Sequence, residues 1–273
     1  MKTIAIANQK GGTGKTTTTV NLGVALAQDG YRVLMVDFDP QANLSSYLGI
    51  EVPDGLSRTI STLMEREIND KTIIPTDFVQ SADGVDFIPA NIVLADMEDF
   101  LHNTMCRETV LRSCLAAYQE KYDYCLIDCA PALGLLLVNA LAASNEVIIP
   151  VQAQPFALEG MRKLMENYFR VKKKINPSIE VGGIVMTMTD KVSRLCREIC
   201  QGVRETYGAK MRVFETTIPR NEPLKVSTEV RHSIFLYDAK CKGAQAYREL
   251  AKEVEDGGRK RQIPNRGTDA LSR

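Results

Sequence analysis

The sequence predicts an α/β fold in which helices cover both faces of a doubly wound, mostly parallel, twisted sheet. Apolar runs typical of buried strands alternate with helical patterns along most of the 273 residues. A glycine-rich loop separates the first of these runs from the first helix, and two later runs end in aspartates. Ligands of such sheets bind at the carboxyl ends of the strands, so we expect the loop and the aspartates to meet there.

In the first half of the chain, a continuous apolar run at 4–7 predicts a buried strand. The helical pattern that follows, from near Lys15 to Gln28, ends two residues before Gly30, a residue suited to a helix C-cap. The apolar run at 32–40 has the spacing of a parallel strand joined by a right-handed crossover. Further along we expect a short helix at 41–48, an amphipathic segment near 60–67 within a surface excursion at 51–82, a strand at 85–89, and helices at 91–105 and 108–120.

In the second half, the same alternation continues to the last amphipathic helix. The expected strands are 124–128, 146–151, 181–188 and 213–218, and the expected helices are 133–143, 157–175, 190–207 and 239–254. No internal repeat or linker indicates a second domain. We therefore expect one domain at 1–256, followed by a polar, basic and disordered tail at 257–273.

Composition excludes several classes of protein. Lys and Arg together number 34, as do Asp and Glu, so a nucleic-acid surface would have to be a local basic patch. The apolar run at the N-terminus is too short for a signal peptide. No run of about 18 apolar residues could span a membrane, so we expect a cytoplasmic protein. The seven cysteines include no C-x-x-C pair, which favours reduced, buried thiols over a metal site.

The glycine-rich loop has the chemistry of a phosphate site. Glycines let backbone N–H groups turn inward, and the helix that follows adds partial positive charge. Lys15 would reach the terminal phosphates, while the Thr16 hydroxyl would hold Mg²⁺. The common G-x-x-x-x-G-K-[ST] pattern needs a glycine at position 9, where this chain has Gln9 followed by a second lysine, Lys10. The alternative interpretation is a tight turn with no bound phosphate. The stretch reads Lys10-Gly11-Gly12-Thr13-Gly14-Lys15-Thr16.

Three aspartates, Asp37, Asp39 and Asp128, end apolar runs and should lie at the same edge of the sheet as the loop. A magnesium-nucleotide needs carboxylates near the metal and a group that orients the attacking water. Each aspartate alone could equally cap the turn or helix that follows it. Together with the glycine loop, the three acids indicate a hydrolytic magnesium site.

The doubled lysine resembles the deviant Walker A signature, K-G-G-x-G-K-[ST], of the ParA/MinD group of P-loop ATPases. This resemblance implies a P-loop NTPase fold, ATP and Mg²⁺ as ligands, and a homodimer that sandwiches two ATP molecules. In such a dimer, Lys10 would cross the interface to the partner's nucleotide.

Other motifs of that group can be followed along the chain. Asp128 resembles the Walker B acid, although Ala130 replaces the first proline of D-x-P-P, and residues 36–41 read V-D-F-D-P-Q like the A′ motif. The resemblance implies that Asp39 orients the attacking water. The implied catalytic residues are Lys10, Lys15 and Asp39; the nucleotide-binding ones are Lys10, Gly11, Gly12, Thr13, Gly14, Lys15, Thr16, Thr17 and Asn221; the metal-site ones are Thr16, Asp37 and Asp128.

The resemblance covers residues 2–254 and includes the ParA-like segments at 150–152, 156–160, 218–221 and 243–247. The chain departs from the family after Asn221, where E-P-L-K-V-S-T replaces the usual V-R-L-S-E-A-P of the adenine-binding loop. Contacts with the nucleotide base beyond Asn221 are therefore left open.

The sequence leaves the class of protein open between a ParA-like protein and three alternatives. MinD-like members dock on membranes through a C-terminal amphipathic helix, but this basic C-terminus has almost no apolar face. A metabolic P-loop enzyme, such as a cobyrinate amidase or dethiobiotin synthetase relative, lacks a visible substrate motif here. An iron protein would need cluster cysteines, and Cys129 fits the core better.

For a ParA-like protein the expected partners are nonspecific double-stranded DNA and a centromere-binding protein of the ParB type. Residues 191–231 hold nine Lys or Arg against five Asp or Glu, although a solvated helix face could account for any single one. No helix-turn-helix module is expected before the loop. We expect slow, partner-stimulated ATP hydrolysis, nucleoid association and a role in plasmid, chromosome or mobile-element partition. The candidate DNA-binding residues are Arg194, Arg197, Arg220, Lys225 and Arg231.

Overall fold

The computed structural model of the chain describes residues 1–154, 157–190 and 192–262. Its sheet has the strand order β3-β4-β2-β5-β1-β6-β7-β8, and every neighbouring pair is parallel except β3 and β4. This confirms the predicted doubly wound sheet. The strands are β1 Lys2–Ile6, β2 Val33–Phe38, β3 Gln80–Ala82, β4 Val85–Ile88, β5 Tyr124–Cys129, β6 Glu146–Gln152, β7 Glu180–Thr189 and β8 Val213–Pro219.

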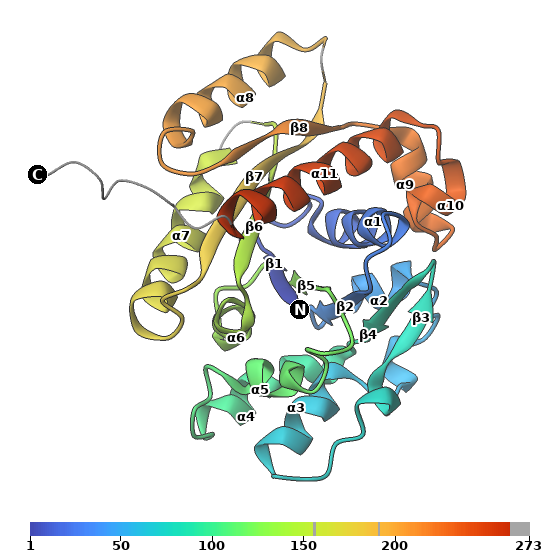
Figure 1. Cartoon of the computed structure of the whole chain (residues 1–273), viewed down its shortest axis with the longest axis vertical. Helices are drawn as coiled ribbons and strands as arrows, with labels where there is room; N and C mark the ends of the chain where they lie inside the picture. The colour runs from blue at the N-terminus through green and yellow to red at the C-terminus, as the bar shows by residue number, and fades with distance from the viewer. Residues whose placement is uncertain (155–156, 191, 263–273) are drawn as a thin grey trace, which may run out of the picture.

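Helices cover both faces of the sheet, with α1 and α11 together on one side and α6 and α7 on the other (Figure 1). Side chains of a strand alternate between the two layers: Leu34 and Val36 of β2 pack with one layer, Val33 and Met35 with the other. The helices are α1 Lys15–Gln28, α2 Asn43–Tyr47, η1 Pro53–Gly55, α3 Ile60–Ile68, η2 Pro75–Phe78, η3 Ile92–Ala95, α4 Met97–His102, α5 Val110–Ala116, α6 Leu135–Ala143, α7 Ala157–Lys174, α8 Arg194–Tyr207, α9 Glu222–Glu229, α10 Ile234–Asp238 and α11 Lys242–Gln262.

The segment expected to be a surface excursion, 51–82, instead contributes to the core. Ile60, Leu63 and Met64 of α3 are buried, as is Phe78. The segment ends in β3, which pairs antiparallel with β4 through a two-residue turn at Asp83 and Gly84, both at positive φ. β4 confirms the strand predicted at 85–89, whereas β3 is short and polar and lacks the apolar run that indicated the other strands.

Helix boundaries differ from the prediction where caps decide them. α8 begins at Arg194 rather than at 190, because the Ser193 hydroxyl accepts a hydrogen bond from the Cys196 N–H. Residues 222–229, expected as a loop, form α9. Pro223 is tolerated there because the first turn of a helix does not need its N–H. The predicted helix at 91–105 is divided into η3 and α4.

The last helix continues past the expected domain end at 256. α11 runs to Gln262, so 257–262 are helical and the expectation of a disordered tail is wrong for them. Gly257 lies inside this helix, with the guanidinium of Arg212 beside it. The remainder of the expected tail, 263–273, lies outside the described residues.

Candidate active site

The glycine loop lies at the carboxyl end of β1, which is flanked by β5 and β6, where the strand order turns. Gly14 is the N-cap of α1 and has a φ of 83°, a left-handed conformation that favours glycine. A Cβ added at Gly11 or Gly12 would meet no atom within 4 Å. The backbone of the loop is therefore open to an approaching anion.

Hydrogen bonds from two other parts of the chain hold the loop in place. Asn8 donates from Nδ2 to the Pro150 carbonyl at 2.7 Å, and its Oδ1 accepts from the Lys10 N–H at 3.1 Å. The Thr187 hydroxyl of β7 donates to the Thr13 carbonyl at 2.8 Å. Sequence reasoning missed both residues, although a polar Asn8 at the end of an apolar strand was a usable signal.

We expect Thr187→Val to weaken ATP binding about three- to tenfold, which corresponds to the loss of one hydrogen bond of about 0.5–1.5 kcal/mol. Valine keeps the shape but cannot donate to Thr13, so the loop should be less well ordered before the phosphate arrives. Titration with a fluorescent ATP analogue measures the effect. Thr76→Val on exposed η2 is a control, and equal affinities for all three proteins would contradict the assignment.

The strand-end aspartates meet as predicted. Asp37 of β2 and Asp128 of β5 are directly opposite in the parallel register, and their exposures are 0% and 1%. Asp37 Oδ2 accepts from both the backbone N–H and the hydroxyl of Ser45, at 2.8 and 2.7 Å. Asp128 Oδ1 accepts from the Thr19 hydroxyl at 3.4 Å. Asp128 Oδ2 is buried and has no hydrogen-bond partner among the described residues.

Burial of the two carboxyls makes their ionised forms costly. Burial raises the pKa of Asp37 to about 7, against the hydrogen bonds from Ser45. Burial, and then the neighbouring Asp37, raise the pKa of Asp128 to about 8, while Thr16 and Lys15 act in the opposite direction. A divalent cation supplies the charge that this pair lacks. Asp128 Oδ2 is buried without a hydrogen-bond partner among the described residues, and Thr16 lies near enough to this carboxyl to lower its pKa. A buried carboxylate oxygen with a hydroxyl close to the same carboxyl fits an oxygen-liganded Mg²⁺.

These pKa shifts predict that the protein without magnesium or nucleotide loses stability as pH rises from about 4 to about 8, above which their effect levels off. Both carboxyls bind protons more tightly when folded than unfolded, so the unfolded state gains as the pH rises. We expect Asp128→Asn to lose less stability over this interval. Urea unfolding at several pH values tests this, with Asp70→Asn at an exposed turn as the control. Parallel curves for Asp128→Asn and the parent would contradict the prediction.

Asp39 is also at this edge and is 6% exposed. Its Oδ1 accepts from the Gln41 N–H at 3.0 Å, so the carboxyl does cap the turn after β2. No hydrogen bond to its Oδ2 is found within the described chain. Capping of the turn therefore accounts for Oδ1 of Asp39 and leaves Oδ2 available to orient a water molecule.

The two lysines of the loop differ in their surroundings. Lys15 is 7% exposed and lies near enough to Asp128 to oppose the rise in its pKa. Lys10 is half-buried, and its backbone is fixed by Asn8 and by the Thr13 hydroxyl, which donates to the Lys10 carbonyl at 3.4 Å. In the part of the chain that the structure describes, no hydrogen bond or ion pair involves the Lys10 ammonium.

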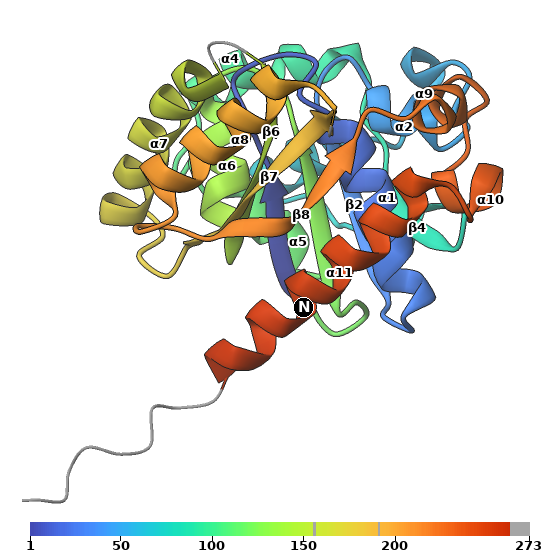
Figure 2. The same ribbon diagram turned by 90° about the horizontal axis from the view of Figure 1, so that it is seen from above.

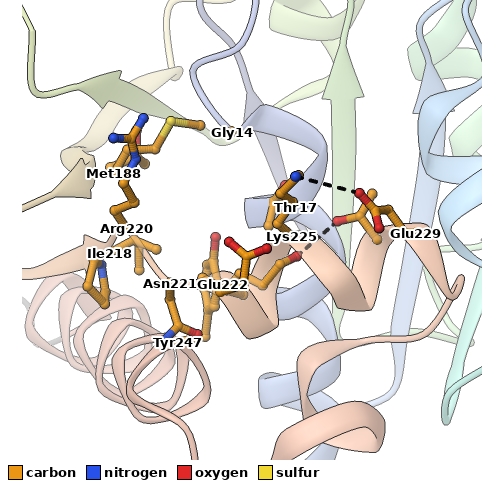
Figure 3. Close-up of a pocket in the computed structure, with 14 residues that line it drawn as sticks. Gly14, Thr17, Met188, Ile218, Arg220, Asn221, Glu222, Lys225, Glu229 and Tyr247 are labelled. Carbon is orange, nitrogen blue, oxygen red and sulfur yellow. Dashed lines mark hydrogen bonds and ion pairs between the residues drawn. The ribbon is translucent and has the colours of Figure 1, made fainter.

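A cavity of about 810 Å³ adjoins the loop, with Gly14 and Thr17 on one side and Asn221 and Tyr247 on the other (Figure 3). Asn221 Oδ1 is buried without a hydrogen-bond partner among the described residues, and it can accept from an amino group of a bound base. Thr187, Met188 and Tyr247 also line the cavity and were not predicted. Its position and size fit the nucleoside of a nucleotide whose phosphates lie on the loop.

The candidate DNA-binding residues are distributed over α8, the end of β8, α9 and the connection between α9 and α10. Arg194 pairs with Glu198 at 2.7 Å on exposed α8, and Arg197 donates to the Val192 carbonyl at 3.4 Å. Arg220 and Lys225 line the nucleoside cavity, with Lys225 Nζ 3.9 Å from Glu229 (Figure 3). Arg231 lies 3.6 Å from Glu51, next to the turn between α9 and α10.

All seven cysteines are free, but only Cys114, Cys125, Cys129 and Cys196 are buried, so the expectation of buried thiols holds for four of them. Cys129 lies within β5 and is 1% exposed, consistent with its interpretation as a core residue. Within the described residues, no helix combines the length and apolar composition needed to cross a membrane.

The loop on β1 and the buried acids on β2 and β5 place this protein among the P-loop ATPases. An AAA domain family profile matches residues 1–181. The sporulation initiation inhibitor protein Soj of Bacillus subtilis is 42% identical over 94% of this chain and 99% of its own length. The chromosome partitioning protein ParA of Caulobacter vibrioides is 41% identical, over 96% and 97%. The chain belongs to the Soj/ParA family of chromosome-partitioning ATPases.

Among solved structures, a cobyrinic acid a,c-diamide synthase from Mycobacterium smegmatis with bound ADP and magnesium has a similar fold. Its TM-score is 0.80 at 33% identity, with 92% of this chain and 93% of that chain covered. This likeness extends the P-loop ATPase fold over nearly the whole chain.

Proposed function

We propose that this chain is an ATP-dependent dimerising switch for partition of a chromosome, plasmid or mobile element. The observation that carries the proposal is Lys10: its backbone is anchored, while its ammonium has no partner within the described residues. A second subunit bound face to face would bring a phosphate to this lysine. The identity with Soj and ParA over almost their full lengths supports the biological role.

In the proposed site, the loop from Gly11 to Thr17 binds the phosphates of ATP through its N–H groups, and Lys15 neutralises their terminal charge. Thr16 and Asp128 would hold Mg²⁺, and Asp37 would support the metal site beside them. The ion would neutralise charge on the phosphates. Asp39 orients the attacking water, and Lys10 stabilises the charge that develops across the interface. The base occupies the cavity beside Asn221.

The ATP dimer should bind double-stranded DNA without regard to sequence, through basic residues that dimerisation aligns. Arg194, Arg197, Arg220, Lys225 and Arg231 remain the candidates. Arg194, Lys225 and Arg231 are paired with acids, which lowers the free positive charge on one subunit and favours weak DNA binding by the monomer. We propose that a ParB-type partner stimulates slow hydrolysis and releases the protein from the nucleoid.

Sizing the protein by light scattering with ADP, ATP or a non-hydrolysable analogue tests the switch, with and without random duplex DNA. We expect a dimer only with ATP or the analogue, and DNA retention that falls steeply with salt. A monomer under every condition would reject the proposal. Retention on liposomes without DNA binding would favour a MinD-like role instead.

A metabolic alternative deserves its own test because the synthase from Mycobacterium smegmatis is 33% identical to this chain. An amide-forming enzyme would show ATP hydrolysis that depends on a carboxylic acid substrate and an amide donor rather than on DNA. Hydrolysis that responds to cobyrinic acid and glutamine, but not to duplex DNA or a ParB-type protein, would support that alternative.

A further inference from the structure

The outer side of η3 and α4 is an exposed apolar and acidic surface, here called the α4 face. It consists of Ile92, Val93, Asp96, Asp99 and Phe100. Ile92 is 51%, Val93 47% and Phe100 49% exposed, whereas Leu94, Met97 and Leu101 of the same segment are buried. The Asp96 N–H donates to the Val93 carbonyl, and the Phe100 N–H donates to the Asp96 carbonyl. Val93, Asp96 and Phe100 are therefore each about one helical turn apart and lie on one side of the segment.

One end of this segment is linked to Asp37. Ala90, two residues before η3, donates its N–H to the Ser45 hydroxyl at 3.0 Å. The same hydroxyl donates to Asp37 Oδ2 at 2.7 Å. Asp37 is buried and can move little on its own, so a displacement of η3 reaches its carboxylate through a single side chain.

The other end is linked to the segment that follows Asp128. Glu98 of α4 accepts at Oε1 from the Leu136 N–H in the first turn of α6, at 3.3 Å. Gly134 lies so close to Glu98 that an added Cβ would overlap its carboxylate. Figure 2 shows α4 at the same edge of the molecule as α2 and α9, the edge at which the strands end. The α4 face thus adjoins the segments that follow both buried acids.

The charge on the α4 face indicates what it binds. Asp96 and Asp99 are exposed, and neither forms an ion pair in the described part of the chain. The nearby Arg107 is occupied by Glu108 at 3.2 Å and by the His102 carbonyl. Two acids without counter-ions beside Ile92, Val93 and Phe100 fit a segment that carries both basic and apolar side chains.

We propose that the α4 face is the docking surface for the partner that stimulates ATP hydrolysis, and that it binds a basic, amphipathic segment of that partner. This inference rests on the proposed function, since it assumes a stimulating protein. Docking displaces α4, and Glu98 and Ser45 pass the displacement to the segments that follow Asp128 and Asp37. Glu98 is a positioning residue in this scheme.

The test measures phosphate release with ATP and random duplex DNA, at increasing concentrations of the ParB-type protein of the same replicon. Phe100→Ser should keep the ATP-dependent dimer and the unstimulated rate but need at least about tenfold more partner for the same stimulation. Phe169→Ser on α7, where the phenylalanine is 59% exposed, is the matched control and should respond like the parent. The double variant Asp96→Lys, Asp99→Lys should bind the partner more weakly and with less dependence on salt.

Glu98→Ala separates docking from its transmission. It should bind the partner normally, as measured by anisotropy of a labelled partner, but show little stimulation. Equal stimulation of Phe100→Ser, Phe169→Ser and the parent would overturn the α4 face as the docking surface. Loss of the ATP dimer in Phe100→Ser would also overturn it and assign the face to a second copy of the chain. A parent protein that neither dimerises nor responds to the partner would reject the proposed function itself.

Discussion

Lys10→Ala is expected to bind ATP with nearly parental affinity and yet to remain monomeric and hydrolyse it at least about 10²-fold more slowly, the scale of a lost transition-state contact. The reason lies in the surroundings of the lysine. Lys15, not Lys10, is the buried cation beside Asp128, and the Lys10 ammonium forms no hydrogen bond or ion pair in the described part of its own chain. The measurements are ATP affinity, mass by light scattering with a non-hydrolysable analogue, and phosphate release.

Two controls give this result its meaning. Lys71→Ala removes an exposed lysine whose ammonium forms an ion pair with Glu65, and it should leave all three measurements unchanged. Lys15→Ala should abolish ATP binding itself, because it removes the cation within the subunit's own loop. A monomeric Lys10→Ala protein that hydrolysed ATP at the parental rate would show that each subunit contains a complete site.

The elements that the sequence predicted well are those with a local signal. Apolar runs are enough to place β1, β2 and β5, and the rule that ligands bind at the carboxyl ends of strands brings Asp37 and Asp128 together. The register then puts these two residues directly opposite each other. Their raised pKa values follow from burial, which the sequence does not give directly. Burial of these acids could nevertheless be expected, because each ends an apolar run typical of a buried strand.

The features that the sequence did not predict depend on contacts between distant segments. Thr187 reaches Thr13 across 174 positions, and nothing near either residue marks the pair. In the sequence, Glu98 is one of several charges in a helical segment. Its hydrogen bond to the first turn of α6 is known only from the structure. Gly257 was expected to begin the disordered tail, but it lies within α11, where an added Cβ would approach Arg212. In each case, tertiary packing gives the residue its role.

Asp39 poses the sharpest question about the chemistry, because it has a structural role as well as a predicted catalytic one. We expect Asp39→Ala to bind ATP and dimerise but to turn over at least about 10²-fold more slowly, since it removes the group that orients water. The same change also removes the cap on the Gln41 N–H, so slow turnover alone would not separate the two roles.

Asp39→Asn separates them, because an asparagine can still accept from the Gln41 N–H but lacks the negative charge. If Asp39 acts chemically, the asparagine variant should unfold at the parental temperature and still turn over nearly as slowly as the alanine variant. It should also stay on DNA after ATP binding, because release requires hydrolysis in the proposed cycle. Parental turnover in Asp39→Asn, with slow turnover only in Asp39→Ala, would reduce Asp39 to a cap and require another residue of the dimer to orient the water.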